Sequence, residues 1–204
     1  MTTEPIRSLE QLRELYPPPG ERAVRKELQG LETHSLNFIA RSPFLVLATS
    51  DLEGALDASP RGGDPGFVKV ADQGQLLIPD APGNNRIDSL QNIVQTGRVG
   101  LIFMIPGIDE TLRINGTALL SRDAQDLRRC ADPRREPRLV IRVTAQQVYM
   151  HCAKAFMRSR LWSDEARQPR GNLPNLGQVI RDQTGIELTP ETQEQMIERY
   201  RKDL

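Results

Sequence analysis

The stretch that decides the fold runs from Leu56 to Gly116, LDASPRGGDPGFVKVADQGQLLIPDAPGNNRIDSLQNIVQTGRVGLIFMIPGIDETLRING. It joins short strand-like runs to two corners that carry arginine and glycine, residues 59–63 and 83–86. Arginine offers phosphate oxygens a planar fork of donors, and glycine lets backbone N–H groups approach an anion. The two corners therefore predict an anion-binding site. The alternative interpretation is two ordinary hairpin turns with solvated arginines.

Seven short segments are rich in strand-forming residues and are bounded by turn residues. A helix is predicted among them over residues 88–95, with Leu90, Ile93 and Val94 facing inward, and another over 123–131. Many short strands with few long crossovers favour a closed or half-closed barrel, so the predicted fold class is mainly β with flanking helices. The predicted strands are 44–49, 55–59, 66–70, 75–78, 98–105, 111–121 and 138–150.

Helices are predicted on both sides of this β-rich core. Residues 8–15 carry a leucine stripe before a run of prolines, and residues 33–41 form a helix that Pro43 stops. After the core, a helix over 151–162 places two cations and the only tryptophan on one face, either as a ligand face or as a surface helix that packs its tryptophan on the core. Two polar helices, 176–183 and 189–202, follow. The predicted division is an N-terminal helical extension (1–42), a core domain (43–165) and a C-terminal helical extension (166–204).

The composition excludes several classes of protein. Lys plus Arg and Asp plus Glu number 27 each, so there is no global basic field for a nucleic-acid partner. The sequence has two cysteines, and it contains neither an apolar run long enough to span a membrane nor a signal-peptide core. We therefore expect a reduced, soluble, cytoplasmic protein without a membrane partner. Two histidines, His34 and His151, are too few for a zinc or di-iron centre, so no metal is predicted. The nucleophile elbow, the phosphate-binding P-loop and the dinucleotide fingerprint are all missing from the sequence.

Five blocks, taken in order, resemble the pyridoxamine 5'-phosphate oxidase-like FMN-binding split-barrel family, and within it a subgroup of FMN-dependent flavoproteins. The resemblance covers about residues 38–162 and implies a split β-barrel that forms a homodimer, with FMN in the groove between subunits. The C-terminal segment that holds the substrate phosphate in pyridoxamine phosphate oxidases has no convincing equivalent here, so vitamin B6 oxidation is not implied. The five blocks are FLVLATSDLEG (44–54), LDASPRGGDPGFV (56–68), LLIPDAPGNNRIDSLQNI (76–93), VGLIFMIPGIDETLRINGTA (99–118) and HCAKAFMRSRLW (151–162).

The resemblance also implies site residues by position. The cofactor-binding positions are Ser59, Arg61, Asn84, Arg86 and Ser89 at the FMN phosphate, the main chain of Gly66, Phe67 and Val68 with Pro79 beside the isoalloxazine ring, and Lys154, Arg158 and Trp162 reaching the flavin of the partner subunit. The implied function is an FMN-dependent oxidoreductase with a small-molecule substrate, in which the cofactor carries the chemistry and no catalytic acid or base is named. The alternatives are a non-catalytic flavin- or haem-binding split-barrel protein and an interaction protein whose arginine corners are structural. The sequence does not separate FMN from a deazaflavin.

Overall fold

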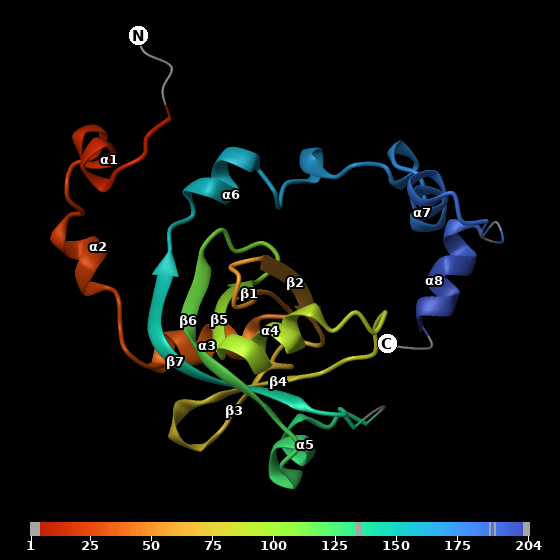
Figure 1. Cartoon of the computed structure of the whole chain (residues 1–204), viewed down its shortest axis with the longest axis horizontal. Coiled ribbons are helices and arrows are strands. Elements are labelled where there is room, and N and C mark those ends of the chain that lie inside the picture. Colours follow the sequence, from red (N-terminus) through yellow and green to blue (C-terminus); the bar gives the residue numbers. More distant parts are fainter. Residues whose placement is uncertain (1–4, 134–135, 188, 190, 202–204) are drawn as a thin grey trace.

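Within the part of the chain that the structure describes, residues 5–133, 136–187, 189 and 191–201, seven antiparallel strands form one sheet. The strand order in this computed structural model is β2-β1-β5-β6-β7-β4-β3, and the sheet curls into a split β-barrel (Figure 1). The fold class predicted from the sequence is confirmed. The strands are β1 (Phe44–Ser50), β2 (Leu56–Gly62), β3 (Lys69–Val70), β4 (Leu76–Pro79), β5 (Arg98–Met104), β6 (Thr111–Ser121) and β7 (Val140–His151).

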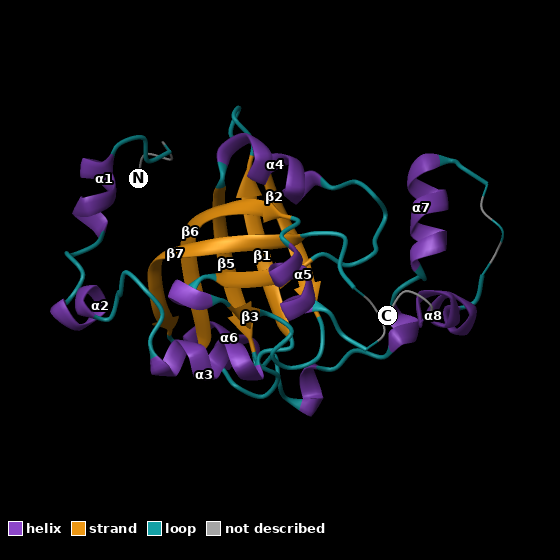
Figure 2. Ribbon diagram, turned by 90° about the horizontal axis from the view of Figure 1, so that it is seen from below, coloured by secondary structure: helices purple, strands orange, loops and turns teal. Residues whose placement is uncertain are grey.

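Helices surround the barrel. Figure 2 shows α3 and α4 at opposite ends of it, while α1 with α2 and α7 with α8 lie outside it on opposite sides. The α-helices are α1 (Leu9–Leu15), α2 (Glu21–Arg25), α3 (Thr33–Arg41), α4 (Asp88–Thr96), α5 (Ala124–Cys130), α6 (Lys154–Ser159), α7 (Leu176–Thr184) and α8 (Gln193–Arg201). Short 3-10 helices span Asp72–Gly74, Asp164–Ala166 and Arg170–Asn172.

The core fills the inside of the curled sheet. Leu45 and Leu47 of β1 and Leu101 and Phe103 of β5 alternate with more exposed residues, so one face of each strand is buried. This period of two is what a half-buried strand requires. The whole stretch 76–78 in β4 is buried, because this short strand is covered on both sides. β2 pairs with β1 at the edge of the sheet, so the β2 residues opposite Leu45 and Leu47 face the same interior.

The N-terminal segment contacts the barrel before α3, where Leu31 packs against the core. Leu28 pairs with Val148 of β7 through two backbone hydrogen bonds, and Lys26 donates its ammonium to the carbonyl of Met150. The preceding helices α1 and α2 bury none of their residues. Among the described residues of α8, only Met196 is buried. The division of the chain at residues 42 and 165 stays a prediction.

The structure corrects several predicted elements. Residues 59–62 belong to β2 and are not a turn, because β2 is an edge strand and tolerates Pro60. The predicted strand 66–70 is reduced to β3, since Gly66 has a φ of +79° and lies in a turn. Helix α2 was not predicted. On α4, Leu90 and Ile93 are buried as expected, whereas Val94 is exposed.

The predicted helix 151–162 is shorter than expected. His151 ends β7, and α6 begins only at Lys154. The helix ends at Ser159, because Arg160 adopts a left-handed conformation with a φ of +51°. Trp162 therefore lies beyond the helix and does not share a helical face with Lys154. The predicted helix 189–202 starts at Gln193; Leu188, Pro190 and residues 202–204 lie outside the described residues.

Candidate functional site

The edge strand β2 presents a polar row toward the inside of the barrel. Its side chains alternate between half-buried and exposed. The half-buried side chains that form this row are Asp57, Ser59 and Arg61. Arg61 is paired with Leu45 of β1, whose side chain is fully buried, so both point to the same face. The first predicted corner is thus an inward-facing strand segment at the edge of the sheet.

Arg61 lies at the centre of a small polar cluster. Its Nη2 donates to Oγ of Ser89 on α4 at 3.2 Å, and its Nη1 lies 3.9 Å from Oδ1 of Asp80. Ser89 in turn donates to Oδ2 of Asp57 at 2.5 Å. Nε of Arg61 is buried and makes no hydrogen bond with any described residue. The guanidinium group is therefore only partly satisfied by its own chain.

The second predicted corner leads directly into α4. Asn84 accepts a hydrogen bond from the backbone N–H of Arg86 at 3.0 Å, which tightens the turn. Asn85 and Ile87 both adopt left-handed conformations, with φ values of +59° and +53°. Such a conformation is a rare one for a β-branched residue and costs energy. Ile87 holds the N-cap position and supplies no side-chain hydrogen bond, so the first turn of α4 is left without a side-chain cap.

Arg86 differs from Arg61 in its surroundings. It is exposed, and its Nε donates to Oδ2 of Asp88 at 2.8 Å. That hydrogen bond, together with the charge of Asp88, raises the pKa of Arg86. An anion that binds Arg86 would therefore compete with the carboxylate of Asp88.

The charges near α4 are close to balance. Two guanidinium groups, of Arg61 and Arg86, lie beside three carboxylates, of Asp57, Asp80 and Asp88. The N-terminus of α4 adds a partial positive charge. An anion bound here would gain specific donors but would meet a field that is not strongly positive.

The residues predicted to run beside a flavin ring occupy the neighbouring loop and strand end. Gly66 approaches the backbone closely, since a Cβ atom there would lie 3.0 Å from the carbonyl oxygen of Ala40. The Val68 side chain is buried in the core, whereas Phe67 packs against the core and stays half-buried. Pro79 ends β4 opposite Val140. This segment therefore offers a planar ligand its main-chain groups and the accessible part of the Phe67 ring.

Lys154, Arg158 and Trp162 do not join this cluster within one chain. Figure 1 shows α6 above the ends of β6 and β7, away from α4. Trp162 donates its Nε1–H to the carbonyl of Ile108 at 3.0 Å and stacks on Phe156, with ring centroids 5.5 Å apart. Lys154 and Arg158 are exposed, and neither forms an ion pair with another described residue.

Sequence reasoning missed the two carboxylates closest to Arg61. Asp57 could have been found, because it lies four residues before Arg61. Residues separated by an even number of positions on a strand share one face. Asp80 carried no such signal. It reaches Arg61 only because the sheet curls and brings β4 toward β2, which are far apart in the strand order.

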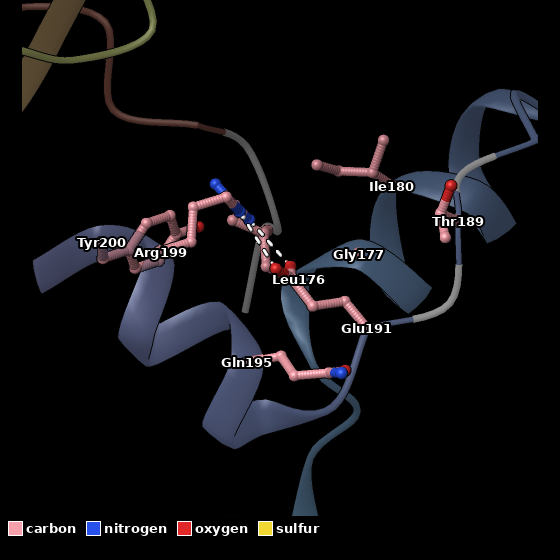
Figure 3. A pocket seen from close by; sticks show the side chains of 8 residues that line it. All are labelled: Leu176, Gly177, Ile180, Thr189, Glu191, Gln195, Arg199 and Tyr200. Atoms are coloured by element: carbon pink, nitrogen blue, oxygen red, sulfur yellow. Dashed lines mark hydrogen bonds and ion pairs between the residues drawn. The ribbon is translucent and has the colours of Figure 1, made fainter. Parts of the chain in front are cut away.

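Two cavities lie away from this cluster. The larger, of about 500 Å³, lies between α7 and α8, where Arg199 pairs with Glu191 (Figure 3). The smaller, of about 140 Å³, is polar and contains Asp126 and Arg142. No described group of three or more His, Cys, Asp and Glu side chains is arranged to hold a metal ion. Nor is any described helix long and apolar enough to cross a membrane.

The chain was compared with known proteins. No curated protein matches it. Among solved structures, HupZ of Group A Streptococcus is 14% identical over 59% of this chain and 94% of that chain, with a TM-score of 0.49. A candidate pyridoxamine 5'-phosphate oxidase of Lactobacillus delbrueckii is 20% identical over 61% and 98%, with a TM-score of 0.47. An F420 reductase is 16% identical over 59% and 98%, with a TM-score of 0.42.

A sequence profile gives the family. The profile described as pyridoxamine 5'-phosphate oxidase matches residues 31–152, which is more than half of the chain. The match spans the barrel from α3 to the end of β7 and includes both arginine corners. The chain therefore belongs to the pyridoxamine 5'-phosphate oxidase family.

Proposed function

We propose that the protein is an FMN-dependent oxidoreductase that acts on a small-molecule substrate. Membership of the family supports this proposal, and one structural observation carries it. Arg61 faces the uncapped first turn of α4 with a buried Nε that has no partner among the described residues. A buried donor without a partner is costly, and a ligand oxygen is one way to satisfy it.

The residues at this corner fit a phosphate group. Arg61 offers a fork of N–H donors and α4 offers backbone N–H groups in its first turn. The Ser89 hydroxyl would donate to the phosphate by leaving Asp57, to which it is bonded in the chain alone. Arg86 and Asn84 border the same turn, and Ser59 lies on the same face of β2 as Arg61. The carboxylates of Asp57, Asp80 and Asp88 oppose the phosphate charge, so further cations are needed for tight binding.

A second copy of the chain is our proposed source of those cations. Lys154 and Arg158 are exposed and have no described ion-pair partner, and α6 lies away from α4 of its own chain. In a homodimer with FMN between subunits, α6 of one copy would approach the ring bound by the other. Trp162, held to the loop after β5, would then cover the ring.

The ring would be held mainly by backbone groups. Gly66 has no side chain, Val68 is buried and Phe67 packs against the core, which leaves N–H and C=O groups for the polar edge of a flavin. Pro79 would border the ring from the end of β4. When bound, FMN would supply hydride and single-electron transfer. The chain's own part is to bind and orient the ring and to place cations near it.

Titration of FMN into the purified protein tests the proposal. Flavin fluorescence should be quenched with a stoichiometry of one FMN per chain, and light scattering should give the mass of a dimer. Arg61→Ala should weaken this binding, whereas its matched control Arg167→Ala should not, because Arg167 is exposed and pairs with nearby Asp164. Anaerobic addition of NADH or NADPH should then bleach the bound flavin. Binding without bleaching by any donor would indicate a non-catalytic flavin protein, whereas no binding would remove the proposal.

A further inference from the structure

We propose that Asp80 competes with the ligand's phosphate group for the guanidinium group of Arg61. In the chain alone its carboxylate faces Arg61, and a bound phosphate would take its place. Asp80 would therefore set how strongly the site responds to the charge of a ligand. This inference rests on the proposed role of Arg61 as a phosphate-binding residue.

The contact between Asp80 and Arg61 is loose. At 3.9 Å between Nη1 and Oδ1, the two groups attract each other but lie beyond hydrogen-bond distance. Both side chains are about four-fifths buried, with 18% and 20% exposed. A phosphate that accepts two hydrogen bonds from the fork at the usual charge-assisted distances would form the stronger contact. Exchange of partners at Arg61 is thus favourable for a ligand that carries phosphate.

Asp80 cannot leave the site when it loses this contact. Its backbone N–H is bonded to the carbonyl of Leu139 at 3.0 Å, immediately after β4. The carboxylate can change its rotamer, but its main chain stays attached to the barrel. A charge held on such a short tether keeps a high effective concentration near Arg61. It therefore both competes for the guanidinium group and repels the phosphate that replaces it.

The other two carboxylates near the corner have different roles. Asp57 accepts the hydrogen bond of Ser89, so its removal would also disturb a residue that holds Arg61. Asp88 pairs with the exposed Arg86 at the start of α4. Asp80 alone among the three accepts no hydrogen bond from a described side chain, so its charge can be removed with little further change.

The test compares Asp80→Asn with wild-type protein in the full chain. Each is titrated with FMN and with riboflavin, which lacks the phosphate, and thermal unfolding is followed with and without inorganic phosphate. Asp164→Asn is the matched control, because it removes the same charge from an exposed pair. Asp80→Asn should bind FMN at least about fivefold more tightly, the scale of two unit charges about 4 Å apart in a water-like medium. Its affinity for riboflavin should match that of the wild type, and phosphate should raise its melting temperature further than it raises that of the wild type.

The outcomes separate this inference from the proposed function. If wild-type protein binds FMN and Asp80→Asn binds it no more tightly, the inference fails and the proposed function stands. If neither protein binds a flavin but phosphate protects Asp80→Asn more strongly, the inference stands and the proposed cofactor fails. Equal gains for FMN and riboflavin would show that the substitution acts on the ring or on the fold, and would overturn the inference. Asp80→Glu, which keeps the charge, should remain close to wild type.

Discussion

Arg61 and Asp80 approach to 3.9 Å although β2 and β4 lie toward opposite ends of the strand order. Their contact joins the edge strand β2 to the segment that directly follows β4. The same guanidinium group reaches Ser89, so three separate segments of the chain meet at one side chain. Arg61 is therefore the residue on which both the geometry and the charge of the candidate site depend.

Replacement of Arg61 by alanine should weaken FMN binding strongly. The loss should be about 1.5–3 kcal/mol, the range for hydrogen bonds to a charged group, which is about a tenfold to 150-fold rise in Kd. Isothermal titration of the apoprotein measures it, and the melting temperature shows whether the barrel still folds. Arg61→Lys should recover part of the affinity, because it keeps the charge and loses the fork. Unchanged flavin occupancy in Arg61→Ala would remove the phosphate assignment.

Arg86→Ala should weaken FMN binding less than Arg61→Ala does. Arg86 is exposed and already paired with Asp88, so a phosphate gains less from it. The effect should shrink as NaCl is raised, since exposed charges are screened. Titrations at low and high salt measure both features. A larger loss in Arg86→Ala than in Arg61→Ala would place the phosphate at the exposed turn and not at the strand.

Trp162→Ala should change the flavin spectrum or the dimer. In the single chain Trp162 holds the segment after α6 through its bond to Ile108 and its stack on Phe156. Trp162→Phe keeps the stacking surface and loses the hydrogen bond, so it should be milder. Absorbance of the FMN-loaded protein and its mass by light scattering are the readouts. If both match wild type in the alanine variant, Trp162 serves only to pack its own chain.

Acid should weaken the pair formed by Asp126 and Arg142. Burial by itself raises the pKa of Asp126, but the hydrogen bonds from Arg142 and Ser121 outweigh it, and the net pKa lies below the ordinary value of an aspartate. A carboxylate with a lowered folded-state pKa contributes stability that is present above its unfolded pKa and is lost as the pH falls through the folded value. Asp126→Asn should therefore lose about 2 kcal/mol at pH 7. Urea unfolding should show this difference shrinking below about pH 4.

The two cysteines should react with thiol reagents very differently. Cys130 is buried under β4, and burial followed by the charge of Asp126 raises its pKa to about 11. Cys152 is exposed just after β7. At pH 8 a disulfide reagent should label one thiol in native protein and two after denaturation. Native Cys152→Ser should show no rapid labelling, and rapid labelling there would mean that the α5 region opens readily.

The sequence predicted elements whose signals are local. Residues 33–41 and 111–121 match α3 and β6 at both ends, because periodic apolar residues and turn residues mark these segments clearly. Trp162 was placed wrongly on a helical face, since the left-handed Arg160 that ends α6 leaves no pattern in the sequence. Glycine is the usual left-handed residue at the end of a helix, so an arginine there does not predict that the helix ends.

The candidate site was predictable only in part. Arg61 and Ser89 were both named from the sequence, and the structure joins them by a hydrogen bond. Asp80 was not expected to oppose them, because its approach depends on how far the sheet curls. The left-handed Ile87, which leaves α4 without a side-chain cap, also follows from tertiary packing and not from local preference.

The most direct test of the account is the absorbance spectrum of freshly purified protein, with mass analysis of whatever heat releases. A protein that holds FMN should show two flavin bands in the near ultraviolet and blue, and should release a compound with the mass of FMN. A released deazaflavin, or a Soret band from haem, would contradict the proposed cofactor. A protein that is colourless and stays colourless after incubation with FMN would contradict the central claim, leaving the family fold without its flavin.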